Sequence, residues 1–126
     1  MHEQKPFILI IEDDKPLRTT LSRYLQATGY VVLQAASFGE ALDHMSIRPA
    51  LVVVDINLPD ATGWDAVKWM QNVTRPVPVI VMSGVARPSP KQLEQAGAKA
   101  FLAKPFPIEE LLRLVKQHAP LPNSAA

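Results

Sequence analysis

Four short apolar runs of the chain lead into polar side chains that can do chemistry. These side chains are Glu12–Asp14, Asp55, Ser83 and Lys104. Several carboxylates at one place repel one another, and a hard divalent cation relieves that repulsion. Because only oxygen ligands are available there, Mg²⁺ is the predicted ion. One carboxylate nucleophile, one metal, one ammonium and one hydroxyl form a set suited to phosphoryl transfer, with Asp55 attacking in line.

Each of these residues also has an ordinary structural explanation. Glu12–Asp14 can cap a helix that starts near Pro16, where acidic residues favour the helix dipole. Ser83 can be a turn residue, and Lys104 can be a solvated surface lysine. We favour a functional site because four strand ends carry chemically complementary groups, which separate structural roles do not explain.

The elements that position these residues alternate along the chain. Five apolar runs are near-continuous, which is typical of strands buried on both faces; they are Phe7–Ile11, Tyr30–Leu33, Leu51–Val54, Val77–Met82 and Ala100–Leu102. Helical repeats lie between them, such as Leu17, Leu21, Tyr24 and Leu25, then Phe38, Leu42 and Met45. This alternation predicts an α/β fold with a parallel sheet and helices on both faces. In such a sheet the ligand site lies beyond the carboxyl ends of the strands.

Composition narrows the classes of protein that remain. The chain has 126 residues, a net charge of +1, 48% hydrophobic residues and no cysteine. One domain fits this length, and we expect it over residues 1–119, with 120–126 as a tail or the start of a linker. The small net charge argues against direct nucleic-acid binding. Apolar runs of about five residues are too short to cross a membrane, and the cytoplasm is the expected location.

As a set, the motifs resemble the receiver domain of two-component response regulators, the CheY-like family. The resemblance covers about residues 7–118 and rests on Ile8–Asp14, Pro16–Arg18, Leu51–Asp60, Gly63, Pro78–Gly84 and Ala96–Phe106. It implies a doubly wound, flavodoxin-like sheet of five parallel strands in the order 2-1-3-4-5. It also implies a phosphoacceptor that takes its phosphoryl group from a histidine kinase or a phosphotransfer protein. Such a domain catalyses only its own phosphorylation and dephosphorylation, so we do not class it as an enzyme.

The resemblance implies a role for each residue at the metal. Asp55 is similar to the phosphorylated aspartate, and Glu12 and Asp13 are similar to the acidic pair that holds Mg²⁺ with it. Asn57 matches the position whose backbone carbonyl completes the metal shell. Asp14 is expected outside that shell, because Glu12 and Asp13 align with the pair.

The resemblance also implies a switch. Ser83 is similar to the hydroxyl that turns toward the phosphoryl group, and Phe101 is similar to the aromatic that then moves inward. Lys104 is similar to the family's lysine, and its peptide bond to Pro105 is often cis in the family. The face formed by the fourth helix, fifth strand and fifth helix would change with these residues. A plain core position is the other interpretation of Phe101.

The fourth helix departs most from the family pattern. Proline cannot lie inside a helix, so Pro88 and Pro90 predict a helix that begins near Pro90 and has about two turns before Gly97. We expect a non-standard surface there, which leaves a receiver homodimer on that face open. Gly84 and the two prolines also suggest a preset, mobile loop beside the site.

Three other functions compete with the phosphoacceptor. A phosphatase of the aspartate-nucleophile type needs a second aspartate where this chain has Asn57, which cannot transfer the proton. A flavodoxin needs a phosphate cradle after the first strand, and Glu12–Asp14 would repel that phosphate. A receiver-like protein-interaction module that is never phosphorylated is the remaining alternative; the full residue set argues against it, and the altered fourth helix keeps it open.

Overall fold

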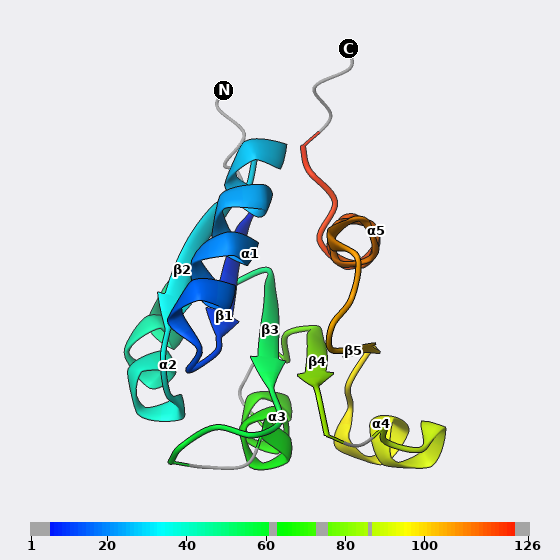
Figure 1. The fold of residues 1–126 in the computed structure, drawn as a ribbon. Coiled ribbons are helices and arrows are strands. Elements are labelled where there is room, and N and C mark those ends of the chain that lie inside the picture. The colour runs from blue at the N-terminus through cyan, green and yellow to red at the C-terminus, as the bar shows by residue number, and fades with distance from the viewer. Residues whose placement is uncertain (1–5, 61–62, 73–75, 86, 123–126) are drawn as a thin grey trace.

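The computed structural model describes residues 6–60, 63–72, 76–85 and 87–122. Five parallel strands form one sheet; they are β1 (Phe7–Ile11), β2 (Val31–Ala35), β3 (Leu51–Asp55), β4 (Val79–Ser83) and β5 (Ala100–Ala103). Their order is β2-β1-β3-β4-β5 (Figure 1), which confirms the predicted topology. The second and fourth strands begin and end slightly later in the chain than the apolar runs predict.

In the described ranges, four α-helices connect the strands and a fifth follows β5; they are α1 (Lys15–Thr28), α2 (Phe38–His44), α3 (Gly63–Gln71), α4 (Pro90–Ala96) and α5 (Ile108–His118). A 3-10 turn, Met45–Ile47, follows α2. The longest helix in the described ranges has 14 residues, and none of them is long and apolar enough to span a membrane.

Helices cover both faces of the sheet, and the strands alternate between two cores. In β1, Ile8 and Ile10 pack against α1 and α5, whereas Leu9 and Ile11 pack on the side of α2, α3 and α4. All four side chains are fully buried. Burial on both sides explains why the strands have continuous apolar runs rather than alternating ones.

Two residues of the helical repeats do not reach either core. Tyr24 is 48% exposed and Leu42 is 41% exposed. In α1, the buried apolar face is narrow and consists of Leu21 and Leu25. In α2, which has only seven residues, Ala41 is the buried residue. Spacing alone therefore overestimates the width of the buried stripes.

Both ends of α4 follow local sequence signals. Ser89 is its N-cap, and the Ser89 hydroxyl accepts a hydrogen bond of 3.1 Å from the backbone amide of Gln92. In return, the side-chain oxygen of Gln92 accepts a hydrogen bond of 2.9 Å from the backbone amide of Ser89. This reciprocal capping box starts the helix at Pro90. Gly97 ends the helix with a left-handed φ of 84°. The short fourth helix predicted from Pro88 and Pro90 is confirmed.

The segment after α5 packs on the domain. The buried Tyr30 hydroxyl donates a hydrogen bond of 2.8 Å to the carbonyl oxygen of Ala119. Leu121 packs against the core shared by α1 and α5, and its side chain lies over Gly29. The first part of the predicted 120–126 tail therefore contacts the folded domain, at least as far as Leu121.

Replacing Tyr30 with phenylalanine is expected to lower the free energy of unfolding by about 1 kcal/mol, because the buried Ala119 carbonyl loses its donor. Urea unfolding measures this change. Tyr24→Phe is the matched control, since the Tyr24 side chain is exposed. Its urea unfolding midpoint should equal that of the wild type. Equal midpoints for the Tyr30 and Tyr24 variants would contradict the structural role of the bond.

Candidate functional site

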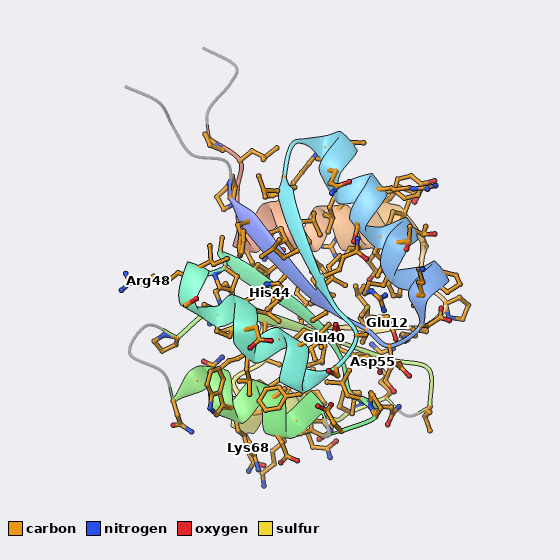
Figure 2. All side chains as sticks on the ribbon, turned by 90° about the vertical axis from the view of Figure 1, so that its left-hand side faces the viewer. Glu12, Glu40, His44, Arg48, Asp55 and Lys68 are labelled. Atoms are coloured by element: carbon orange, nitrogen blue, oxygen red, sulfur yellow. The ribbon has the colours of Figure 1, made fainter. Side chains whose placement is uncertain are left out.

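The candidate site lies at the carboxyl ends of the strands. Asp55 and Ser83 are the last residues of β3 and β4, while Glu12 and Lys104 directly follow β1 and β5. The registers bring these ends level: Ile11 pairs with Val54, Asp55 with Met82, and Ser83 with Ala103. Figure 2 shows Glu12 and Asp55 side by side. The predicted meeting of these strand ends at one rim is therefore what the structure describes.

Lys104 bridges the two buried carboxylates. Its Nζ donates a hydrogen bond of 2.7 Å to Asp55 Oδ2 and a second, short bond to Glu12 Oε1. Glu12 is 1% exposed and Asp55 is 5% exposed. The ammonium group therefore balances two carboxylates that water hardly reaches, and breaking this cluster would leave buried charge uncompensated. The Lys104–Pro105 peptide bond is cis.

Three carboxylates at the rim lie close enough to share one cation. Glu12, Asp13 and Asp55 each offer an oxygen, and these atoms lie within 4.8 Å of one another. Asp13 is exposed, whereas the other two are buried. A donor set of carboxylate oxygens with one side open to water fits Mg²⁺, which keeps several waters and few protein ligands.

Two neighbouring polar residues have separate positions. Asp14 caps α1 by accepting a hydrogen bond of 3.1 Å from the Leu17 amide, and it is outside the three-carboxylate group. The backbone amide of Asn57 donates a hydrogen bond of 2.9 Å to Asp55 Oδ1, while the Asn57 side chain is exposed. This bond orients the Asp55 carboxylate and holds the loop after β3 against it.

Burial sets the protonation of the site. Desolvation raises the pKa of Glu12 from its ordinary 4.5 to about 7, even though hydrogen bonds from Lys104 and the Asp14 amide act to lower it. Burial also acts to lower the pKa of Lys104, but its bonds and charge interactions with Asp55 and Glu12 prevail and raise it. The ammonium therefore stays charged at neutral pH, while Glu12 is poised to exchange a proton.

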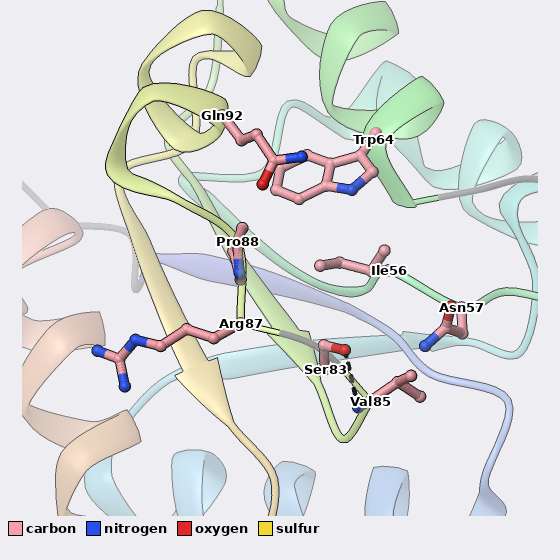
Figure 3. Close-up of a pocket in the computed structure, with 8 residues that line it drawn as sticks. All are labelled: Ile56, Asn57, Trp64, Ser83, Val85, Arg87, Pro88 and Gln92. Atoms are coloured by element: carbon pink, nitrogen blue, oxygen red, sulfur yellow. Dashed lines mark hydrogen bonds between the residues drawn. The ribbon is translucent and has the colours of Figure 1, made fainter.

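Ser83 begins the connection to α4. It is 4% exposed, and its Oγ accepts a hydrogen bond of 3.1 Å from the Val85 amide (Figure 3). A pocket of about 160 Å³ lies beside it, and Trp64 and Pro88 are among the residues that line it. Pro88 is buried, so the connection is anchored before α4 begins. Ala86 lies outside the described residues, and so does that part of the loop predicted to be mobile.

Phe101 lies in the middle of β5, opposite Val81 of β4. It is half-buried and packs against the core formed with α2, α3 and α4. The Arg87 guanidinium carbon lies 5.9 Å from the centre of its ring. Phe101 is therefore neither a fully buried core residue nor a solvent-exposed one.

Two further residues hold the rim, and sequence reasoning assigned them no role. The Arg18 guanidinium donates a hydrogen bond of 2.7 Å to the Glu12 carbonyl oxygen. The available sequence signal was that Arg18 lies four residues after the helix cap Asp14, and therefore in the first turns of α1 near the end of β1. Asp60 accepts hydrogen bonds from the Phe38 and Gly39 amides at 3.0 and 2.9 Å, which tie the loop after β3 to the start of α2. Local sequence holds no signal for that contact.

The fold and the rim define a class of protein: a doubly wound α/β domain whose acidic site is bridged by a lysine. The family model of the response regulator receiver domain matches residues 8–116. Sporulation initiation phosphotransferase F of Bacillus subtilis is 32% identical over 119 residues, which cover 93% of this chain and 96% of that protein.

A second curated relative and a solved structure indicate the same family. The response regulator MprA of Mycolicibacterium vanbaalenii is 37% identical over 109 residues, covering 83% of this chain but 46% of that protein. A CheY-like receiver domain from Methanospirillum hungatei has a TM-score of 0.82 at 29% identity, covering 90% of this chain and 93% of that one. The chain belongs to the family of receiver domains of two-component response regulators.

Proposed function

We propose that this domain is a phosphoacceptor that takes a phosphoryl group onto Asp55 from a histidine kinase or a phosphotransfer protein. The observation that carries the proposal is the joint environment of the Asp55 carboxylate. It accepts a hydrogen bond from Lys104, and it lies within one cation's reach of Glu12 and Asp13. A nucleophile beside an ammonium and a cation site is the arrangement that phosphoryl transfer requires.

The proposed step exchanges one bond for another. An Asp55 carboxylate oxygen forms a bond to phosphorus, the bond from phosphorus to the donor's imidazole nitrogen breaks, and the imidazole leaves with the electron pair. Lys104 and Ser83 bind phosphoryl oxygens through N–H and O–H donors. Mg²⁺, held by Glu12, Asp13, Asp55 and the backbone carbonyl of Asn57, would supply further positive charge at those oxygens when bound.

The switch belongs to the same proposal. A phosphoryl group adds about 1.5–2 negative charges at neutral pH. The Ser83 Oγ accepts a hydrogen bond from the Val85 amide, so its O–H remains available to donate to a phosphoryl oxygen once the side chain turns toward Asp55. Phe101 follows, and the face of α4, β5 and α5 changes for a partner. A receiver homodimer is one such partner, and we place the domain in the cytoplasm without direct nucleic-acid contact.

Asp55→Asn tests the phosphoacceptor. With Mg²⁺ and acetyl phosphate, the intact mass of the wild-type protein is expected to increase by one phosphoryl group, and the variant should show no adduct. Asp43→Asn is the matched control, because this exposed carboxylate lies on α2, and it should be phosphorylated like the wild type. Beryllofluoride, which mimics a phosphoryl group on aspartate, should bind the wild type and not Asp55→Asn.

The result that contradicts the proposal is equally specific. A wild-type protein without an adduct, and without Mg²⁺ binding by titration, would favour the receiver-like interaction module. The short α4 is the observation that supports that second function. An adduct that persists in Asp55→Asn would instead move the acceptor to another residue.

A further inference from the structure

Arg87 is a cation that contacts the proposed switch residue Phe101. No part of the proposed phosphoryl transfer uses it. Its guanidinium carbon lies 5.9 Å from the centre of the Phe101 ring. That distance is within the range of a cation–π interaction. Figure 3 shows the Arg87 side chain pointing away from Trp64 and Gln92, across β5. The contact therefore joins the connection after β4 to the middle of β5.

The backbone around Arg87 is tied to the site at one end and to α4 at the other. Before it, the Val85 amide donates to Ser83 Oγ at 3.1 Å. After it, Pro88 is buried and Ser89 is locked in the capping box with Gln92. A rotation of the Ser83 side chain that moves Oγ toward Asp55 would change the bond to the Val85 amide, two residues before Arg87.

The connection also borders free space. Val85 and Arg87, both exposed, line the pocket of about 160 Å³, so the Arg87 side chain has room beside it that is not filled by the core. Phe101, by contrast, belongs to β5, and its half-buried ring packs against the core on one side only. A turn of the Arg87 side chain toward the pocket would carry its guanidinium away from the ring.

We infer that Arg87 is a positioning residue that holds Phe101 in its unphosphorylated position and releases it when Ser83 turns. This inference rests on the proposed function. The cation–π contact stabilises the unphosphorylated arrangement, so it slows phosphorylation. At an exposed site, such a contact corresponds to a change of about two- to five-fold in an equilibrium or a rate.

The test compares rates of adduct formation with acetyl phosphate and Mg²⁺, followed by intact mass. Arg87→Met keeps the apolar stem and removes the cation, and it should be phosphorylated about two- to five-fold faster than the wild type. Lys91→Met is the matched control, because it removes an exposed cation from α4, and its rate should not change. A double-mutant cycle then adds Phe101→Leu. Arg87→Met should have no effect once the ring is gone.

A second readout needs no phosphodonor. Fluorophenylalanine labels the four phenylalanines, and the fluorine signal of Phe101, assigned with Phe101→Leu, should move in Arg87→Met but not in Lys91→Met. An unchanged signal and an unchanged rate in Arg87→Met would overturn the inference. Equal acceleration with and without the Phe101 ring would overturn it too, since Arg87 would then act on the donor's charge. A wild-type protein without any adduct contradicts the proposed function itself, and the inference with it.

Discussion

Lys104→Met is expected to destabilise the metal-free protein by about 2–3 kcal/mol at pH 8, because two buried carboxylates lose their shared cation. Removing one partner of a buried ion cluster costs about 3–5 kcal/mol. We expect less here because the Lys104 side chain keeps 21% of its surface exposed. Protonation of Glu12 should reduce the loss further as the pH falls.

Urea unfolding in EDTA measures this loss, and the same experiment with Mg²⁺ separates electrostatics from packing. The cation should restore most of the stability of Lys104→Met, since it balances the same carboxylates. Lys99→Met is the matched control: Lys99 is exposed, and its midpoint should match that of the wild type. If Mg²⁺ fails to narrow the gap between Lys104→Met and the wild type, the loss is one of packing rather than charge.

The metal-free protein is expected to lose stability as the pH rises from about 4.5 to about 7. The pKa of the Glu12 carboxyl lies at about 7 in the folded protein, against an ordinary value of 4.5. Within this window, the folded state holds a proton that the unfolded state has released, so raising the pH favours unfolding. The contribution is complete below 4.5 and is lost once the pH passes 7.

Glu12→Gln isolates this effect. The amide keeps the shape of the side chain, but its single oxygen can accept only one of the two hydrogen bonds that Glu12 accepts at separate oxygens, from Lys104 and from the Asp14 backbone amide. The variant should be more stable than the metal-free wild type at pH 8, by on the order of 2 kcal/mol, and should lack the falling slope. Urea midpoints between pH 4.5 and 8 measure both features. Parallel pH profiles for the two proteins would show that Glu12 does not carry the titration.

Mg²⁺ binding should show the opposite dependence on pH. A proton on the Glu12 carboxyl competes with the cation, so the apparent affinity of the wild type should fall about ten-fold for each pH unit below 7. Calorimetric titration between pH 5.5 and 8, values chosen to be about one unit or more on either side of 7, follows this change. In Glu12→Gln, the affinity should be weaker and nearly constant over that range.

Much of the fold could be predicted from local sequence. Continuous apolar runs separated by helical repeats are sufficient to predict a parallel sheet covered by helices on both faces. In such a sheet both faces of a strand are buried, so the strand has no polar face. The start of α4 was also predictable, since Pro88 and Pro90 exclude a helix interior before Pro90. Less predictable was the width of the buried stripes: Tyr24 keeps helical spacing but is 48% exposed.

The candidate site divides in the same way. Glu12, Asp55, Ser83 and Lys104 were identifiable because a parallel sheet brings the carboxyl ends of its strands to one edge. Which carboxylates share Lys104 was not identifiable, since that depends on side-chain reach across the rim. From the sequence, Asp14 could either cap the first helix or belong to the acidic site. In the structure it caps α1, because its carboxylate accepts a hydrogen bond from the Leu17 amide.

The sequence by itself determined the class of fold, the rim at which the polar residues gather and the chemistry that their types allow. The tertiary structure alone decided the contacts between distant segments: Lys104 with Glu12 and Asp55, Arg87 with Phe101, and Tyr30 with Ala119, 89 residues away. The physical reason is range. Periodicity and capping act over a few residues, whereas these contacts depend on how whole elements pack against one another.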